Sequence, residues 1–334
     1  MQIEFIGEGA LTRVGDIIAE HQAKKVALVV GKSSYSTSGA QAVLAPILMP
    51  LEVLTLEQAS PLPLEEDIAT LALTLAQFAP DLVLAIGGGH VMDVAKAANA
   101  RATSAPLVTV PTTAGSGAES TPFAVAYKDG VKMSLEGPEF LPAYAVVDPL
   151  LIASTPRLPM VASALDALAQ AMESHWSRRA TEESRALSQE AMRLVWQSIV
   201  QAIENKEKSA LSDLARGAHL AGKAIAIAKT TACHAFSYGL TAQYGVPHGV
   251  AVAVFLPSMM RFNGASFGDI TPEATEALLE RLQVPRLSAF GVPRDAIHGL
   301  ATEVNAERLG NNPRSMTQED ITMVYTTVWN QYLN

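Results

Sequence analysis

Two histidines are the residues in this chain most suited by type to hold a metal ion. His234 and His248 stand fourteen positions apart in the stretch HAFSYGLTAQYGVPHG, residues 234–249. Neutral imidazole is the commonest metal ligand, and one Asp with two His is a plausible set for Zn²⁺ or Fe²⁺. A single histidine on an apolar face is more often a hydrogen-bonded core residue. A spacing of fourteen does not decide between these interpretations until a fold brings the two side chains together.

A carboxylate for such a site occurs in SALDALAQAMESHWS, residues 163–177. If this stretch is a helix, Asp166, Gln170 and Glu173 stand at positions i, i+4 and i+7 and share one face. The surrounding positions are apolar, so we expect this face to point inward. A buried carboxylate needs a cation or good hydrogen bonds, so a metal ligand is one interpretation of Asp166. The alternative is an aspartate that caps a helix or pairs locally.

Two glycine-rich turns follow predicted strands and are suited to binding a dinucleotide. They are AIGGGHVMDVAKA (85–97) and VPTTAGSGAEST (110–121). Glycine lets the backbone approach a phosphate, the N–H groups at a helix start favour an anion, and ligands bind at the carboxyl ends of parallel strands. The first turn lacks the usual G-x-G-x-x-G spacing, and either turn alone could be purely structural. We expect cofactor contacts from Gly87, Gly88, Gly89, His90, Asp93, Thr112, Thr113 and Ser116.

The first half of the chain must supply the sheet that carries these turns. Short apolar runs at 24–31, 51–56, 81–89 and 105–113 alternate with helical stretches such as 64–80 and 90–103. This alternation predicts a parallel sheet covered by helices on both faces. After residue 150, long helical stretches follow at 160–177, 182–205 and 209–228, with no clear strand between them. We therefore predict a Rossmann-like α/β dinucleotide-binding domain over residues 1–155 and an all-α metal-binding domain over residues 156–334.

The composition excludes several classes of protein. The 334 residues are 49% hydrophobic and 17% charged, which is typical of a packed soluble protein. The net charge of −9 argues against nucleic-acid binding, because phosphate contacts need clustered Lys and Arg. No apolar run approaches the ~20 residues of a membrane span, and MQIEFIGEGA lacks the pattern of a signal peptide. The single cysteine, Cys233, excludes an internal disulfide. We expect a cytoplasmic protein that binds a small-molecule substrate and no membrane.

Five stretches together resemble the iron-containing (group III) alcohol dehydrogenase family, of the dehydroquinate-synthase-like superfamily. They are GGGHVMDVAKA, VPTTAGSGAEST, AVVDP, DALAQAMES and HAFSYGLTAQYGVPHGVAVAVFLP, in this order along the chain. The resemblance implies the two-domain fold predicted above, with the active site in the cleft between a dinucleotide-binding domain and a helical metal domain. It also implies that Asp166, His234 and His248 bind a divalent metal ion.

Three positions depart from the family pattern. The fourth ligand, usually a His four residues after the Asp, is Gln170, whose carbonyl oxygen is a weaker ligand, so Fe²⁺ and Zn²⁺ are both open. Where the family often has a His linked to proton relay, this chain has Tyr238, which either passes a proton or only packs and orients the substrate. Lys32 stands where the family often has an Asp that accepts a hydrogen bond from the ribose 2′-OH of NADH. Together with Ser33, Lys32 favours the 2′-phosphate of NADPH. The alternative is that the Lys32 side chain points to solvent. Lys132 is a further expected cofactor contact.

The residues before His234 predict an acidic group on the substrate. Relatives are typically apolar or glycine-rich there, whereas this chain has Lys229, Thr230 and Thr231. A lysine in a partly dry cleft is costly unless an anion meets it, and two hydroxyls add donors. The alternative is that Lys229 forms a salt bridge within the fold. With Arg314 as a further contact, the pattern resembles the branch of the family that interconverts phosphonoacetaldehyde and 2-hydroxyethylphosphonate.

The predicted activity is metal-assisted hydride transfer between NAD(P)H and a small aldehyde. The metal acts as a Lewis acid on the aldehyde oxygen, Lys229 holds the substrate anion, and a proton arrives through Tyr238 or water. The alternatives are a generic alcohol dehydrogenase of this family, a cyclising lyase of the dehydroquinate synthase type and a non-catalytic dinucleotide-binding protein. Because relatives are often dimers, we also expect a homo-oligomer.

Overall fold

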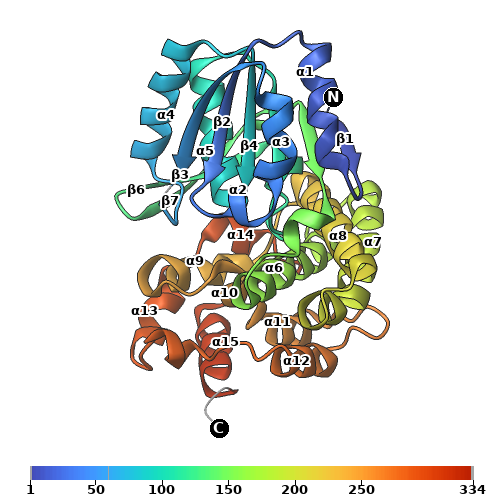
Figure 1. Cartoon of the computed structure of the whole chain (residues 1–334). Coiled ribbons are helices and arrows are strands. Elements are labelled where there is room, and N and C mark those ends of the chain that lie inside the picture. Colours follow the sequence, from blue (N-terminus) through green and yellow to red (C-terminus); the bar gives the residue numbers. More distant parts are fainter. Residues whose placement is uncertain (1, 59, 332–334) are drawn as a thin grey trace.

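A parallel sheet of six strands forms the framework of the first half of the chain (Figure 1). In this computed structural model, which describes residues 2–58 and 60–331, the strands are β1 (Ile3–Ile6), β2 (Lys25–Gly31), β3 (Glu52–Gln58), β4 (Leu82–Gly87), β5 (Leu107–Pro111) and β8 (Tyr144–Val147). Their order is β1-β8-β5-β4-β2-β3, and every neighbouring pair is parallel. The apolar runs LVLAIG and LVTVP form the central strands β4 and β5, which are buried along their whole length.

Helices cover both faces of this sheet. On one face pack α1 (Arg13–Glu20) and α3 (Ala40–Leu48), through residues such as Ile17 and Leu44. On the other face lie α4 (Glu65–Phe78) and α5 (Gly89–Ala102), through residues such as Leu75 and Val94. A short helix, α2 (Ser34–Thr37), follows β2. The predicted Rossmann-like α/β half is therefore confirmed.

An antiparallel hairpin, β6 (Phe123–Lys128) and β7 (Val131–Glu136), forms a small separate sheet. The sequence analysis did not predict it. The signal was Asp129–Gly130, a dipeptide in which both residues have positive φ and which is typical of a two-residue hairpin turn. Strand β6 packs on α5, whereas β7 reaches α9 of the helical half. The hairpin thus spans from the sheet to the helices.

The remainder of the chain is helical, as predicted. Its helices are α6 (Arg157–Trp176), α7 (Glu182–Glu204), α8 (Lys208–Ala228), α9 (Ala232–Tyr244), α10 (His248–Ala253), α11 (Leu256–Asn263), α12 (Pro272–Arg281), α13 (Ala296–Thr302), α14 (Ala306–Gly310) and α15 (Gln318–Gln331). Short 3₁₀ turns occur at Ala10–Thr12, Ala118–Ser120, Pro138–Phe140, Pro149–Ile152 and Leu287–Phe290. The last strand ends at Val147 and α6 begins at Arg157, but the boundary at residues 155 and 156 stays a prediction. Within residues 2–58 and 60–331, no helix has both the length and the apolarity required to traverse a bilayer.

The second glycine-rich turn fixes the sheet against α8. Gly117 has a φ of +61°, and a Cβ on it would lie 2.4 Å from Cα of Gly222. A Cβ on Gly222 would in turn lie 2.3 Å from the hydroxyl of Ser120. Only glycine permits this approach, so the turn and the helix lie in direct backbone contact.

A buried charge cluster lies beside this contact. Nδ1 of His219 on α8 is 3.1 Å from Oε1 of Glu119, and its Nε2 is 3.4 Å from Oε2 of Glu4 on β1. Burial opposes the charge on His219, but the hydrogen bonds to Glu119 and Glu4 raise its pKa to about 9. The hydrogen bond to His219 lowers the pKa of Glu4 to about 2. The two halves of the molecule are therefore joined by a charged histidine between carboxylates.

Candidate active site

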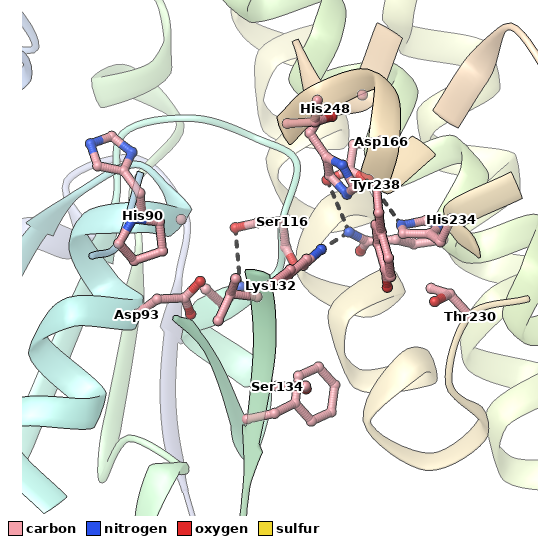
Figure 2. Close-up of a pocket in the computed structure, with 18 of the residues that line it drawn as sticks. His90, Asp93, Ser116, Lys132, Ser134, Asp166, Thr230, His234, Tyr238 and His248 are labelled. Carbon is pink, nitrogen blue, oxygen red and sulfur yellow. Dashed lines mark hydrogen bonds and ion pairs between the residues drawn. The ribbon is translucent and has the colours of Figure 1, made fainter. Parts of the chain in front are cut away.

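A cavity of about 400 Å³ lies where the carboxyl ends of the strands face the helices (Figure 2). Residues of both halves line it. From the sheet half come Gly89, His90, Asp93, Thr113, Ser116, Lys132 and Ser134. From the helical half come Asp166, Gln170, Thr230, His234, Tyr238, His248 and Arg308. The cavity therefore joins both predicted parts of the site, the glycine-rich turns and the candidate metal ligands.

Asp166, His234 and His248 converge on one point in this cavity. Their candidate ligand atoms all lie within 4.8 Å of one another. Oδ1 of Asp166 is 3.3 Å from Nε2 of His234 and 4.0 Å from Nε2 of His248. Asp166 lies on α6, His234 in the first turn of α9, and His248 begins α10. Gly245, with a φ of +64°, ends α9 and turns the chain back, so that the fourteen-residue separation becomes a contact.

Two side-chain oxygens beside the histidines are free to bind a divalent metal ion. Oδ1 of Asp166 and Oε1 of Gln170 are buried and have no hydrogen-bond partner among the described residues. Nε2 of Gln170 donates to Oδ2 of Asp166 at 3.1 Å and to the carbonyl of Ser116 at 3.4 Å. Both partners only accept, so the amide nitrogen must face them and Oε1 is left free. Two free oxygens and two imidazoles are a donor set that Zn²⁺ and Fe²⁺ both accept, so the residues fit such an ion.

Glu173 holds His234 from the opposite side. Its fully buried carboxylate accepts from Nδ1 of His234 through Oε2, which leaves Nε2 facing Asp166. Oε1 accepts from the backbone N–H of Thr231 at 3.2 Å, from the Thr231 hydroxyl at 2.7 Å and from the N–H of Cys233 at 2.8 Å. Such a carboxylate fixes the tautomer and orientation of a ligating histidine. Glu173 was expected on the inward face of the helix, but its sequence context indicated no function for it.

The two histidines differ in their electrostatic surroundings. Burial and the charge of Lys132 lower the pKa of His248 to about 3, so its imidazole is neutral. Burial also opposes charge on His234, but Glu173 and Asp166 outweigh it and raise the pKa of His234 to about 9. Burial favours a protonated Asp166, yet the nearby His234 and Lys132 hold the pKa of Asp166 below its usual value. A cation bound here replaces the proton of His234.

Several of the predicted cofactor residues meet on the other wall of the cavity. A Cβ on Gly89 would lie 2.6 Å from the hydroxyl oxygen of Ser116, so the two glycine-rich turns touch. Gly87 and Gly88 form the turn that leads from β4 into α5, and Thr112 is buried behind the cavity wall with its hydroxyl unpaired among the described residues. His90, Asp93 and Thr113 line the cavity. Burial raises the pKa of Asp93 to about 6.

Lys32 and Ser33 lie apart from this wall. They follow β2, whose carboxyl end shares an edge of the sheet with those of β4 and β5. Lys32 borders a second hollow with Tyr35 and Glu57, whereas Ser33 precedes α2 and its carbonyl accepts from hydroxyls of that helix. Their role at a cofactor therefore stays a prediction.

Tyr238 lies between the ligand cluster and two cations. Its ring stacks on that of His248, with centroids 6.4 Å apart at 25°, and Nζ of Lys132 is 3.8 Å from its centroid. Burial raises the pKa of Tyr238, but the charges of Lys132, His234 and Arg308 outweigh it and lower that pKa. Arg308, on α14, was not identified from the sequence, because nothing around it resembles a motif.

The structure does not place Lys229 in the cavity. Its ammonium group forms an ion pair with Glu136 of β7 and lies 4.4 Å from the centroid of the Phe123 ring. Thr230 does line the cavity, but Lys229 does not. The expected contact with a substrate anion is thus replaced by the alternative, a salt bridge within the fold, because the hairpin brings a carboxylate to the lysine.

Thr231 and Arg314 also lie away from the cavity. Thr231 is completely buried, and its hydroxyl donates to Glu173 and accepts from Nε1 of Trp176 at 2.9 Å. Arg314 is exposed, donates to the carbonyl of Phe262 and lies 4.8 Å from the centroid of its ring. Neither residue is thus free to bind a substrate in this arrangement.

Comparison with known proteins agrees with this geometry. The family profile described as iron-containing alcohol dehydrogenase matches residues 3–149, and the profile of the C-terminal part of that family matches residues 160–276. Phosphonoacetaldehyde reductase of Streptomyces viridochromogenes is 36% identical over 308 residues, which cover 77% of this chain and 78% of that protein. Alcohol dehydrogenase 4 of Saccharomyces cerevisiae is 28% identical over 365 residues, with 96% and 95% coverage.

A solved structure shares the fold over nearly the whole chain. The iron-containing alcohol dehydrogenase of Thermococcus thioreducens superposes with a TM-score of 0.87, covers 98% of both chains and is 24% identical. The fold is therefore the dehydroquinate-synthase-like arrangement predicted above. The two matched profiles span both the sheet and the helical half, and the family implies a divalent metal and NAD(P). The chain belongs to the iron-containing alcohol dehydrogenase family and is an oxidoreductase.

Proposed function

We propose that this protein is a metal-dependent reductase that uses NAD(P)H to reduce a small aldehyde carrying an acidic group, with phosphonoacetaldehyde as the first candidate. The observation that supports it most is the shared cavity, in which the ligand cluster faces the two glycine-rich turns. The candidate substrate comes from the relative that is 36% identical over 77% of this chain. A generic alcohol dehydrogenase is the second candidate, favoured by Alcohol dehydrogenase 4 of Saccharomyces cerevisiae, which matches nearly the whole chain.

In this proposal the residues of the chain position the reactants. Asp166, His234, His248 and Gln170 hold the metal, and Glu173 keeps Nε2 of His234 turned toward it. When bound, the metal polarises the aldehyde oxygen and the reduced nicotinamide supplies the hydride. The glycine-rich turns orient the cofactor across the cavity. Tyr238, stacked on His248, donates its hydroxyl proton to the former carbonyl oxygen, which completes the product alcohol, and in the reverse reaction it takes that proton back.

The finer properties of the cofactors are part of the proposal. The mixed oxygen and nitrogen ligands suit Fe²⁺ or Zn²⁺. Lys32 favours the 2′-phosphate of NADPH, whereas Glu57, which borders the same hollow, suits the ribose hydroxyls of NADH. We propose NADPH as the preferred cofactor, because Lys32 directly follows β2.

The test is consumption of reduced cofactor by the metal-loaded protein. Phosphonoacetaldehyde is compared with propanal, a neutral aldehyde of similar length, and NADPH with NADH in parallel. We expect kcat/KM to favour the phosphonate by about 100-fold, the effect of one or two charge-assisted hydrogen bonds. Equal kcat/KM values for the two aldehydes would leave a generic alcohol dehydrogenase. A protein that binds NADPH but reduces no aldehyde with Fe²⁺ or Zn²⁺ present would contradict the reductase itself.

A further inference from the structure

Two cationic side chains in the cavity have no carboxylate partner. Lys132 and Arg308 both line it, and neither has a carboxylate within 4.0 Å among residues 2–58 and 60–331. Both side chains are half-buried. Half-buried cations that lack a counter-charge lose hydration without compensation, so the cavity favours an anionic ligand.

The other charged residues near the cavity are already paired or assigned. Lys229 forms its ion pair with Glu136. Glu307, which also lines the cavity, lies 3.6 Å from Arg179. Asp166 belongs to the ligand cluster. Asp93 is half-buried and lines the cavity from α5; burial raises its pKa to about 6, and the charges of Lys96 and Lys132 oppose that rise, so its carboxylate still carries most of its charge at neutral pH. Among the described residues, Lys132 and Arg308 are thus cations of the cavity with no carboxylate within 4.0 Å.

The two cations come from opposite halves of the molecule and converge on Tyr238. Lys132 lies on β7, and its Nζ is 3.8 Å from the centroid of the Tyr238 ring. Arg308 lies on α14, which packs against α9, the helix that carries Tyr238. Because the Tyr238 ring stacks on His248, one aromatic ring separates Nζ of Lys132 from the ligand cluster. Figure 2 shows Lys132 between the sheet wall and Tyr238, with Ser134 on the hairpin and Thr230 beside the helices.

We infer that Arg308 and Lys132, the latter in place of the cofactor contact predicted from the sequence, form the subsite that binds the acidic group of the substrate, a tetrahedral oxyanion such as a phosphonate. The inference rests on the proposed function, because it deepens the choice of an anionic aldehyde. In phosphonoacetaldehyde, one methylene group separates the carbonyl group from the oxyanion. A substrate whose carbonyl group lies at the ligand cluster would therefore place its oxyanion near Lys132, which is one aromatic ring away. The guanidinium group binds two oxygens at once through its paired N–H donors, and the ammonium group acts as a point charge on the third. The hydroxyls of Thr230 and Ser134, which also line the cavity, are further donors.

The experiment measures binding of 2-hydroxyethylphosphonate to the metal-loaded protein with NADP⁺, by calorimetry, so that it does not depend on turnover. Arg308→Gln and Lys132→Gln are compared with matched controls: Arg216→Gln, an exposed arginine on α8, and Lys128→Gln, an exposed lysine on the same hairpin. We expect each cavity variant to weaken Kd about 10- to 100-fold, the range for one charge-assisted hydrogen bond. The controls and the Kd for 1-propanol should change less than about twofold.

Binding of NADPH to the same variants separates this inference from a cofactor role. If Lys132→Gln weakens NADPH binding and leaves the phosphonate Kd unchanged, Lys132 belongs to the cofactor and the two-cation subsite is wrong. An unchanged phosphonate Kd in Arg308→Gln overturns the inference even if the wild type reduces phosphonoacetaldehyde. Wild-type protein that binds 2-hydroxyethylphosphonate no better than 1-propanol overturns both the subsite and the anionic substrate. Wild-type protein that binds the phosphonate through Arg308 but turns over no aldehyde supports the subsite and contradicts the reductase.

Discussion

Replacing Glu173 by glutamine tests how the ligand cluster is held. The carboxylate is completely buried, and its Oε1 accepts from Cys233 at 2.8 Å and twice from Thr231, while Oε2 accepts from Nδ1 of His234. In Glu173→Gln, the remaining oxygen must serve the three donors on the Oε1 side, so the new NH₂ group faces Nδ1–H of His234. Two donors then oppose each other. The histidine relieves this by moving its proton to Nε2, the atom that faces Asp166.

The expected loss follows from these contacts. A hydrogen bond to a charged group contributes about 1.5–3 kcal/mol, and a protonated Nε2 cannot ligate a metal without first losing its proton. Residues that orient a ligating histidine typically change metal affinity by about 10- to 100-fold. We therefore expect Glu173→Gln to weaken the Kd for Zn²⁺ by about 10- to 100-fold.

The assay is competition with a chromophoric chelator for Zn²⁺, at fixed pH. Thermal unfolding of the metal-free protein is measured beside it, to separate a loss of ligand geometry from a loss of fold. Glu183→Gln, an exposed change in the first turn of α7, is the control. A Zn²⁺ affinity within about twofold of wild type, in a folded Glu173→Gln protein, would refute the proposed positioning by Glu173.

Three further predictions follow from other parts of the structure. Gln170→His supplies a stronger ligand than an amide oxygen, so Zn²⁺ affinity in the chelator assay should rise about tenfold or more; unchanged affinity would mean that residue 170 does not reach the ion. A Cβ in Gly249→Ala would lie 1.7 Å from the carbonyl oxygen of Ala162, so α10 must shift, and we expect a loss of about 1–3 kcal/mol in unfolding free energy together with reduced metal content. If metal content stays at the wild-type level, the position of α10 does not control the cluster. The pKa of His219 rises from 6.5 to about 9 on folding, so protonated His219 stabilises the folded state by up to about 3 kcal/mol. This contribution is complete below pH 6.5 and disappears as the pH rises through 9. The pKa of Glu4 falls from 4.5 to about 2, so its contribution is present above pH 4.5 and is lost toward pH 2. Urea unfolding across this pH range should show that the wild type loses unfolding free energy at alkaline pH and that His219→Gln does not. If both proteins lose the same amount, groups other than His219 cause the loss.

Local sequence patterns were sufficient to predict most of the framework. Apolar runs that end in glycine marked β2 and β4, and 3.6-residue periodicity marked α6, α7 and α8. These features depend on neighbours within a few residues, which the sequence displays directly. The β6–β7 hairpin was missed because its strands are short and form a sheet of their own, although the Asp129–Gly130 turn was visible.

The sequence alone determined the chemical types at the site, through the order of its motifs and the resemblance that they carry. It could not determine which charges find partners. Lys229 and Glu136 are 93 residues apart, and only the docking of the hairpin on the helices makes them an ion pair and removes the lysine from the cavity. The same docking places Lys132 beside Tyr238, with no carboxylate of the described residues within 4.0 Å. The reason is physical: helix and strand propensities act over a few residues, whereas the energy of a charge depends on every group that the fold brings within a few ångströms, whatever its position in the chain.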